Sequence, residues 1–373
     1  MKERSIGVQI AFTLVPIIIS LLIGAVLVLA VGKNPLEVFE RVWEGAFRNT
    51  RSISSVLNFW IPLTLVSLGL VITFRAGLWN IGIEGQMMAG AIFASWAALF
   101  VPVEAQFAPL LVALEIILAM IGGMVWGLLA GFLKVRLGVN EIFGGIALNA
   151  LADVWAIYLI SGPWQPEIGG SAQATSPFPP TALLPNLSED WTVSLTALVI
   201  TVLVIILIPL ALRGTRWGLQ LKATGRNARS ALLLGVPTTQ ATLSAFLVCG
   251  ALAGIAGAYR VLFTFTSLRP LVSGGIGFLG LLVVMLVSTR ILLIPFITFV
   301  FSAILAGSTR LKITLQLDAS LAGVLQGTLV LLVLLSNGLR QRFAPGASSN
   351  GDDVAAAAVP VEKPGLSGEV VRE

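Results

Sequence analysis

Hydrophobic residues dominate the chain in long runs that are separated by short polar or Pro/Gly-rich segments. The runs at 8–31, 110–133, 195–212 and 321–335 contain almost only apolar side chains. A helix of about 20 apolar residues is long enough to cross the hydrocarbon core of a bilayer. It also satisfies its own backbone hydrogen bonds there. The pattern therefore predicts an all-α protein, built as a polytopic bundle of transmembrane helices.

Dividing the chain at its charged and Pro/Gly-rich breaks predicts about ten spans. Lys and Arg are more frequent in the segments that share a side with the two termini, so the N- and C-termini are expected in the cytoplasm. The first run lacks a small-residue cleavage pattern, and we interpret it as a retained span, not a removed signal peptide. The predicted spans lie near residues 8–31, 59–74, 86–101, 110–133, 142–161, 193–212, 239–259, 274–289, 291–307 and 320–337.

Composition excludes several classes of protein. The 373 residues are 57% hydrophobic and 11% charged, whereas about 25% of a soluble domain is charged. There is no histidine and one cysteine, Cys249, so histidine metal sites, Ser-His-Asp triads and Cys-His pairs are unavailable. The net charge of +5 is distributed over span ends, which indicates membrane orientation and no nucleic-acid partner. Because no Gly-x-x-x-x-Gly-Lys-Ser/Thr element occurs, we expect no bound ATP or other cofactor.

The predicted domain organisation is one transmembrane domain, residues 1–340, followed by a tail at 341–373. The tail is rich in Ala, Gly, Pro and Ser, which cannot build a core, so a disordered cytoplasmic segment is expected. Outer loops are expected at 32–58 and 161–192, and a long cytoplasmic loop at 213–237.

The two outer loops differ in character. Glu37, Glu40 and Glu44 in the first loop have the spacing of an amphipathic helix, and the second loop is rich in Pro, Gly and Ser. Each loop could contact an extracytoplasmic partner or serve only as a solvated connector. The sequence does not decide between these interpretations.

Two charges, an asparagine and three glycines interrupt the apolar pattern at 74–86. The composition predicts an interrupted helix or a tight turn between two spans. Arg75 and Glu84 could neutralise each other where either charge alone would be costly near hydrocarbon, and Asn80 lies between them. The alternative is an ordinary cytoplasmic turn with two solvated charges.

The loop at 213–237 contains the pattern of a short capped helix. Asn227 is a suitable N-cap, and Gly235 with Pro237 closes the segment. Ala228 and Ala231, together with Leu232, would form a small apolar strip suited to docking into a groove of another protein. The alternative is that topology alone explains the basic residues of this loop.

Polar residues also enter the predicted span at 142–161. Asn140 and Glu141 precede it, and Asn149 and Asp153 are four positions apart and share a helix face. Ionisable residues within the membrane often mark a transport path, although a purely structural hydrogen bond between helices is the alternative. Glu115 lies in another span without an evident polar companion.

At these residues the chain strongly resembles the permease subunits of ATP-binding cassette (ABC) importers related to the ribose and branched-chain amino acid systems. It is most similar to the longer permease of the nucleoside, or basic membrane lipoprotein, systems. The matching blocks are 74–86, 138–163 with Asn140-Glu141 and Leu148-Asn149, the Pro-rich loop 161–187, and 216–235. One departure is that Leu279-Gly280 follows Gly277-Phe278 where the family often has an acidic residue and Gly. The ligand could therefore differ from that of relatives, and Arg290 has no assigned role.

The resemblance implies a transport subunit without enzymatic activity, in a bacterial inner membrane. It would form the pathway for a nucleoside or related small polar solute with a second, distinct and shorter permease. A substrate-binding lipoprotein would deliver the solute from outside. The coupling helix would sit on a separate ATPase subunit and would include Gly225, Asn227, Ala228, Ala231 and Gly235.

Three alternatives stay open at this stage. A permease of the same class could carry a simple sugar. An ion-coupled secondary transporter could hold its ion between Asp153, Glu115 and Asn149. A membrane enzyme is disfavoured, because no acid, base and nucleophile converge in the sequence.

Overall fold

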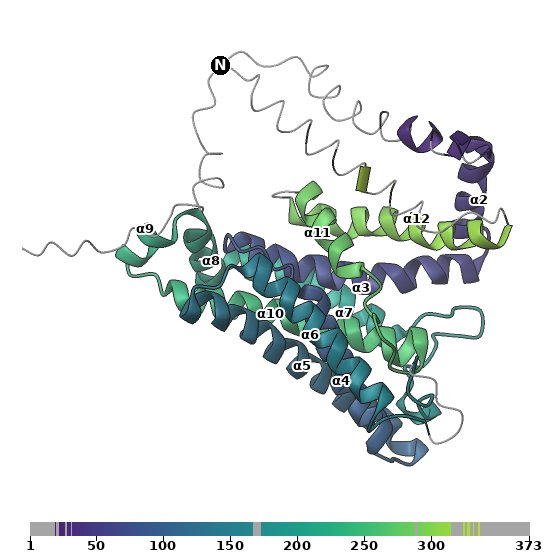
Figure 1. Ribbon diagram of the computed structural model, residues 1–373, viewed down its shortest axis with the longest axis horizontal. Helices are drawn as coiled ribbons and strands as arrows, with labels where there is room; N and C mark the ends of the chain where they lie inside the picture. Colours follow the sequence, from purple (N-terminus) through teal and green to yellow (C-terminus); the bar gives the residue numbers. More distant parts are fainter. Residues whose placement is uncertain are drawn as a thin grey trace, which may run out of the picture.

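The chain folds into a bundle of long α-helices, shown as a computed structural model in Figure 1. The structure describes residues 32–166, 173–287 and 290–314, most of residues 19–30, and a few positions between 324 and 335. That part of the chain contains no β-strand. The all-α prediction is therefore confirmed.

The helices follow one another with short connections, apart from the segment between α6 and α7. In chain order they are α2 (Pro35–Phe47), α3 (Thr50–Arg75), α4 (Ile83–Phe100), α5 (Ala108–Leu137), α6 (Glu141–Ser161), α7 (Leu195–Gly214), α8 (Arg216–Arg226), α9 (Ala228–Leu233), α10 (Thr238–Tyr259), α11 (Ile276–Val287) and α12 (Ile294–Thr314). Short 3-10 segments occur at Ala105–Phe107, Pro180–Ala182 and Ile291–Leu293, and a π-helical turn at Arg260–Phe265 extends α10.

Seven of the described helices are long and apolar enough to cross a membrane, so the chain is a multi-pass membrane protein. They coincide with seven of the predicted spans, and α11 is a shorter apolar helix where a span at 274–289 was predicted. The predicted spans at 8–31 and 320–337 lie largely outside the described residues, and the tail at 341–373 lies wholly outside them. The count of ten spans and the cytoplasmic placement of both termini stay predictions.

The segment 32–58, which was predicted to be an outer loop, is largely helical. It contains α2, as the spacing of its glutamates predicts, and α3 already begins at Thr50. The Asn49 side chain explains this early start, because it accepts a hydrogen bond of 2.9 Å from the Ser52 amide and so caps the helix.

The three helices α3, α4 and α10 form the centre of the bundle. In the most apolar 18-residue stretch of each of these helices, 78% of the residues are buried, compared with 22% in α6 and 28% in α7. Small residues allow this close packing: a Cβ on Gly254 of α10 would collide with the Ala119 carbonyl of α5, and one on Gly90 of α4 would collide with Gly254. The central helices therefore touch backbone to backbone, while α6 and α7 lie at the periphery.

The two ends of the bundle carry different structures. In Figure 1, α8 and α9 lie at one end, and α2 lies at the other. The described part of the second outer loop packs onto the chain after α10, where the Thr175 amide donates to the Leu268 carbonyl at 3.0 Å and the Phe178 amide to the Thr266 carbonyl at 2.9 Å. This loop is therefore attached to the bundle.

Candidate functional site

The predicted interruption between two spans is confirmed at the connection from α3 to α4. Gly77 has a φ of +73°, which glycine adopts without strain, and it reverses the chain after α3. Asn80 is buried and exchanges two hydrogen bonds of 3.1 Å with the Gln86 side chain, and its Nδ2 also lies 3.1 Å from the Cys249 sulfur on α10. Asn80 therefore ties the turn to α4 and α10.

The hypothesis of an ion pair between Arg75 and Glu84 is wrong. Among the described residues the ion pairs are Arg41 with Glu44 and Lys134 with Glu141. Arg75 is the last residue of α3 before the chain reverses, whereas Glu84 lies in the first turn of α4, which faces another helix.

Glu84 instead caps the N-terminus of α11. Its Oε1 accepts a hydrogen bond of 3.0 Å from the Phe278 amide, and it also accepts from the Gly277 amide and from Ser273. Only 7% of the Glu84 side chain surface is exposed. The first amides of a helix lack partners within the helix and favour negative charge, so a carboxylate from α4 replaces the cap that the local sequence lacks.

The chain that leads into α11 is irregular. Thr266 and Leu271 have φ values of 54°, which is unusual for residues with a side chain, and Gly274 and Gly275 also have positive φ. Arg260 holds this segment: its Nε donates to the Val272 carbonyl at 3.1 Å, and its guanidinium lies 4.5 Å from the Phe265 ring centroid. Irregular backbone within a membrane protein is tolerated where protein buries it or where it lines a cavity.

Asn149 and Asp153 differ in their surroundings. The Asn149 Oδ1 accepts from the Gly85 amide at 2.7 Å, and its Nδ2 donates to the Ile81 carbonyl at 2.9 Å. These two bonds fit the alternative interpretation, in which Asn149 forms a purely structural hydrogen bond between helices. Asp153 is half-buried and lies within electrostatic range of Glu84.

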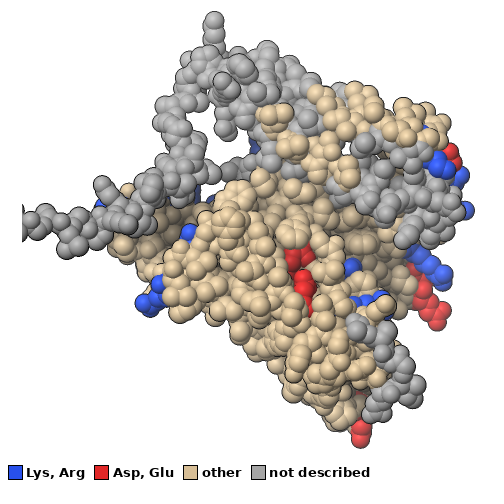
Figure 2. Space-filling view, in the orientation of Figure 1, with Lys and Arg blue, Asp and Glu red and all other residues tan. Residues whose placement is uncertain are grey.

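Glu84 on α4 and Asp153 on α6 lie near enough for their charges to interact, without a direct contact between them. Figure 2 shows a group of acidic atoms near the middle of the visible surface, surrounded mainly by uncharged residues, with basic atoms to the right. We call the pair the acidic face. Its members were predicted separately, but the sequence contains no signal that joins them, because they are far apart along the chain.

Asn140 and Glu141 stabilise the start of α6. The Asn140 Oδ1 accepts from the Ile142 amide at 2.9 Å and caps the helix. Glu141 forms an ion pair of 2.6 Å with Lys134 at the end of α5. Gly138, with a φ of +67°, turns the chain between these helices. The contacts of both residues are therefore local to the α5–α6 hairpin.

The loop at 213–237 consists of two helices, α8 and α9. Asn227 caps α9 as predicted, with its Oδ1 accepting from the Ser230 amide at 2.9 Å, and Gly235 ends the segment with a φ of +81°. The predicted strip of Ala228, Ala231 and Leu232 is not a single surface, because Ala231 is buried while its two neighbours are exposed.

The exposed apolar residues of this loop lie slightly further along. Leu232 is 61% exposed, and Leu233 and Leu234 are each 84% exposed. The sequence analysis did not single out the last two. Their signal was a run of three leucines at the end of a polar loop.

Gly225 connects α8 with the turn between α3 and α4. A Cβ on Gly225 would collide with the Arg75 carbonyl and would lie 2.8 Å from the Gly77 amide nitrogen. A second anchor is Trp217, whose Nε1 donates to the Ser244 hydroxyl of α10 at 2.8 Å. The loop that carries α9 is therefore held against the end of α3, the turn that follows it, and α10.

Glu115 stays apart from the other polar residues. It is fully buried in α5, and within the described residues neither carboxylate oxygen has a hydrogen-bond partner.

The described residues also contain no group of three acidic or cysteine side chains that could hold a metal ion. Arg290 is exposed next to the 3-10 turn before α12.

Curated proteins with similar sequences are ABC transporter permeases. The chain is 28% identical to the nucleoside permease NupB of Lactococcus lactis subsp. cremoris, over 80% of this chain and 84% of that protein. It is 26% identical to the guanosine permease NupP of Bacillus subtilis, over 88% and 93%. It is 25% identical to the glucose permease TsgB13 of Haloferax volcanii, over 88% of each chain.

A protein family also matches most of the chain. Its description is branched-chain amino acid transport system / permease component, and the match covers residues 52–334. That range includes nearly all of α3, the helices α4 to α12, the acidic face and the loop that carries α9. The chain therefore belongs to the permease components of branched-chain amino acid type transport systems, and it is an ABC transporter permease.

Proposed function

We propose that this permease forms the translocation pathway of an importer for a nucleoside or a related small polar solute. The observation that carries the proposal is the contact between Gly225 and the turn at Gly77, which links the loop with the exposed leucines of α9 to the turn that leads into Glu84. Two similar proteins are named for nucleoside or guanosine transport, which supports this solute class.

The docking surface would be Leu232, Leu233 and Leu234 at the end of α9. Three exposed leucines in contact with water are unfavourable, and burying one leucine side chain contributes about 1.5–3 kcal/mol. A groove on a separate ATPase subunit is the occupant that suits an ABC permease. The chain has no phosphate-binding loop of its own, so the energy of ATP hydrolysis would arrive through this contact.

Movement of the docked ATPase would reach the pathway through rigid contacts. Gly225 in α8 is in close backbone contact with the turn at Gly77. The same turn is followed by α4, which carries Glu84 in its first turn. Glu84 in turn holds the N-terminus of α11. A displacement of α8 would therefore change the relative positions of α4 and α11 beside Asp153.

The acidic face would border the pathway, with a second, distinct and shorter permease on its other side. A substrate-binding lipoprotein would dock at the end of the bundle opposite α9, where the second outer loop lies. We place the whole assembly in a bacterial cell membrane with α9 in the cytoplasm. Asp153, which is half-buried, would supply hydrogen-bond acceptors for the hydroxyl groups of a solute, while Asn149, on the same helix, ties α6 to α4.

A simple sugar is the second candidate solute, because one similar protein is named for glucose transport. Both candidates present hydroxyl groups to an acidic face. Uptake of radiolabelled guanosine and glucose by the complete transporter in proteoliposomes would decide between them. Uptake that needs internal ATP supports the ABC mechanism, and uptake that an uncoupler abolishes at constant ATP would overturn it in favour of ion coupling.

Co-purification from mild detergent tests the docking surface. We expect the ATPase subunit to accompany the wild-type chain and to be lost from the variants Leu233→Asp and Leu234→Asp. Leu187→Asp is the matched control, because Leu187 is exposed in the second outer loop. Retention of the ATPase by both α9 variants would contradict the proposal. Gly225→Asp is a less clear test, because a side chain there disturbs the packing of α8 itself.

A further inference from the structure

Helix α2 presents an apolar surface that the described part of the chain leaves exposed. Leu36, Phe39 and Trp43 are 78%, 64% and 59% exposed. They are three and four positions apart, so they share one face of the helix. We call them the α2 stripe. Three large apolar side chains on a single face require an environment other than water.

The residues of α2 that are buried against the bundle lie on a different side of the helix from the α2 stripe. Val38, Gly45 and Ala46 are buried, and a Cβ on Gly45 would lie 2.8 Å from the Gly307 carbonyl oxygen of α12. This close contact seats one side of α2 on α12. Successive residues of an α-helix are 100° apart around its axis. On this basis the apolar residues of α2 span about twice the arc that packs against α12.

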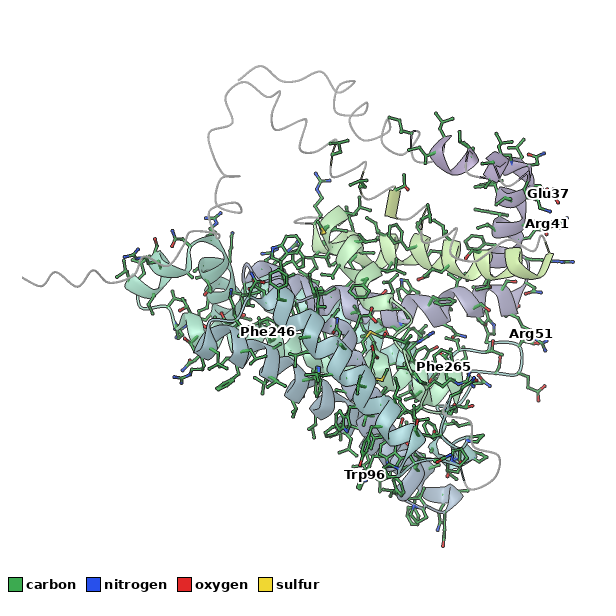
Figure 3. All side chains as sticks on the ribbon, viewed as in Figure 1. Glu37, Arg41, Arg51, Trp96, Phe246 and Phe265 are labelled. Carbon is green, nitrogen blue, oxygen red and sulfur yellow. The ribbon has the colours of Figure 1, made fainter. Side chains whose placement is uncertain are left out.

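Charged residues occupy the remaining side of α2. Glu37, Glu40, Arg41 and Glu44 lie together on the helical wheel, and Arg41 pairs with Glu44 at 3.1 Å. Figure 3 shows Glu37 and Arg41 at the edge of the molecule, on the same side as Arg51 at the start of α3. The α2 stripe thus lies between a face buried in protein and a face suited to water.

The direction of α2 matches the plane of a membrane. The apolar helix Leu22–Ala30 that precedes it is bent from it by 107°. In Figure 1, α2 runs across the ends of α3 and α12, at the end of the bundle opposite α9. A helix that crosses the ends of spanning helices lies near the bilayer surface.

We propose that α2 is an interfacial helix whose stripe lies in the boundary between lipid headgroups and acyl chains. A wide apolar sector, a charged opposite face and a tryptophan are the features of helices that lie in this boundary. Lys33 and Arg48 flank the helix, and their charges suit lipid phosphates. The first outer loop is therefore a lipid anchor that holds the ends of α3 and α12 at a set depth.

Spin labelling of the complete transporter in nanodiscs of phosphatidylethanolamine and phosphatidylglycerol tests this inference. Labels are placed at Leu36→Cys and Trp43→Cys, with Glu40→Cys as the matched control on the charged face. Native Cys249 is fully buried and can remain. Size-exclusion chromatography verifies assembly, and the experiment needs no knowledge of the solute, so its outcome is independent of the proposed function.

We expect oxygen to relax the labels at 36 and 43 more strongly than a water-soluble nickel chelate does, with a depth of about 5–10 Å below the headgroups. The label at 40 should show the reverse preference. Stripe labels that are shielded from both reagents would indicate a protein partner and overturn the inference. Stripe labels that the nickel chelate reaches as readily as the control would overturn it too.

Discussion

The backbones of Gly225 and Gly77 are in direct contact, although 148 positions (225 − 77) separate them along the chain. Gly225 belongs to α8, which leads into α9, and Gly77 begins the turn that leads into α4. No side chain intervenes, so there is no flexible element to absorb a displacement. We therefore expect α8 and the turn that precedes α4 to move together.

Replacing Gly225 with alanine should weaken this link. The added methyl group would collide with the Arg75 carbonyl, and overpacking of this kind costs about 1–3 kcal/mol. We expect solute uptake to fall while the ATPase subunit remains bound, since the α9 leucines are unchanged. Gly214→Ala is the control, because a Cβ at Gly214 meets no atom within 4 Å. Equal uptake by the two variants would show that the contact transmits nothing.

Glu84 should stabilise the protein by capping α11 and not by pairing with Arg75. In Glu84→Leu the Phe278 and Gly277 amides lose their acceptor, and each unsatisfied buried group costs about 1–3 kcal/mol. Glu84→Gln keeps one acceptor and should unfold at a temperature closer to wild type. Thermal unfolding of the detergent-solubilised transporter measures both.

A double-mutant cycle tests whether Arg75 and Glu84 are energetically coupled. Because Arg75 forms no ion pair with Glu84, the effects of Arg75→Gln and Glu84→Gln on the unfolding free energy should add within about 0.5 kcal/mol. A larger coupling energy would show that the two side chains do form an ion pair.

Asn149 and Asp153 should respond differently to substitution, despite sharing a helix. Asn149→Ala removes two hydrogen bonds to the turn before α4 and to its start, and we expect it to lower the melting temperature. Asp153→Asn removes a charge from a half-buried position, so it should lower the rate of uptake with little change in melting temperature. An Asp153→Asn variant with full uptake would remove this residue from the pathway.

Glu115 should be dispensable for transport. Because its carboxylate oxygens have no hydrogen-bond partner in the described residues, burying this group costs free energy that methionine would not. Glu115→Met should therefore raise the unfolding free energy by about 1–3 kcal/mol and leave uptake unchanged. Loss of uptake with normal assembly would assign Glu115 a functional role.

Local features of the structure were predictable from the sequence. Apolar runs located seven spans, because burial in lipid requires nearly every residue of a span to be apolar. Asn227 and Gly235 were recognised as helix caps, since capping depends on a side chain and amides within a few positions. The break after Arg75 followed from clustered glycine and polar residues. Each of these depends on neighbours in the chain.

The tertiary structure alone decided which distant groups meet. Glu84 was given the wrong partner, because a charge pattern cannot reveal that the Phe278 amide, 194 positions away, lies closer than Arg75. The same holds for Gly225 against Gly77 and for Asn80 beside Cys249. Most of the helices, the local caps at Asn227 and Gly235, and the family could be predicted from the sequence. The packing of glycine-rich helix faces determined the acidic face, because small residues permit several close approaches and only the assembled bundle selects one.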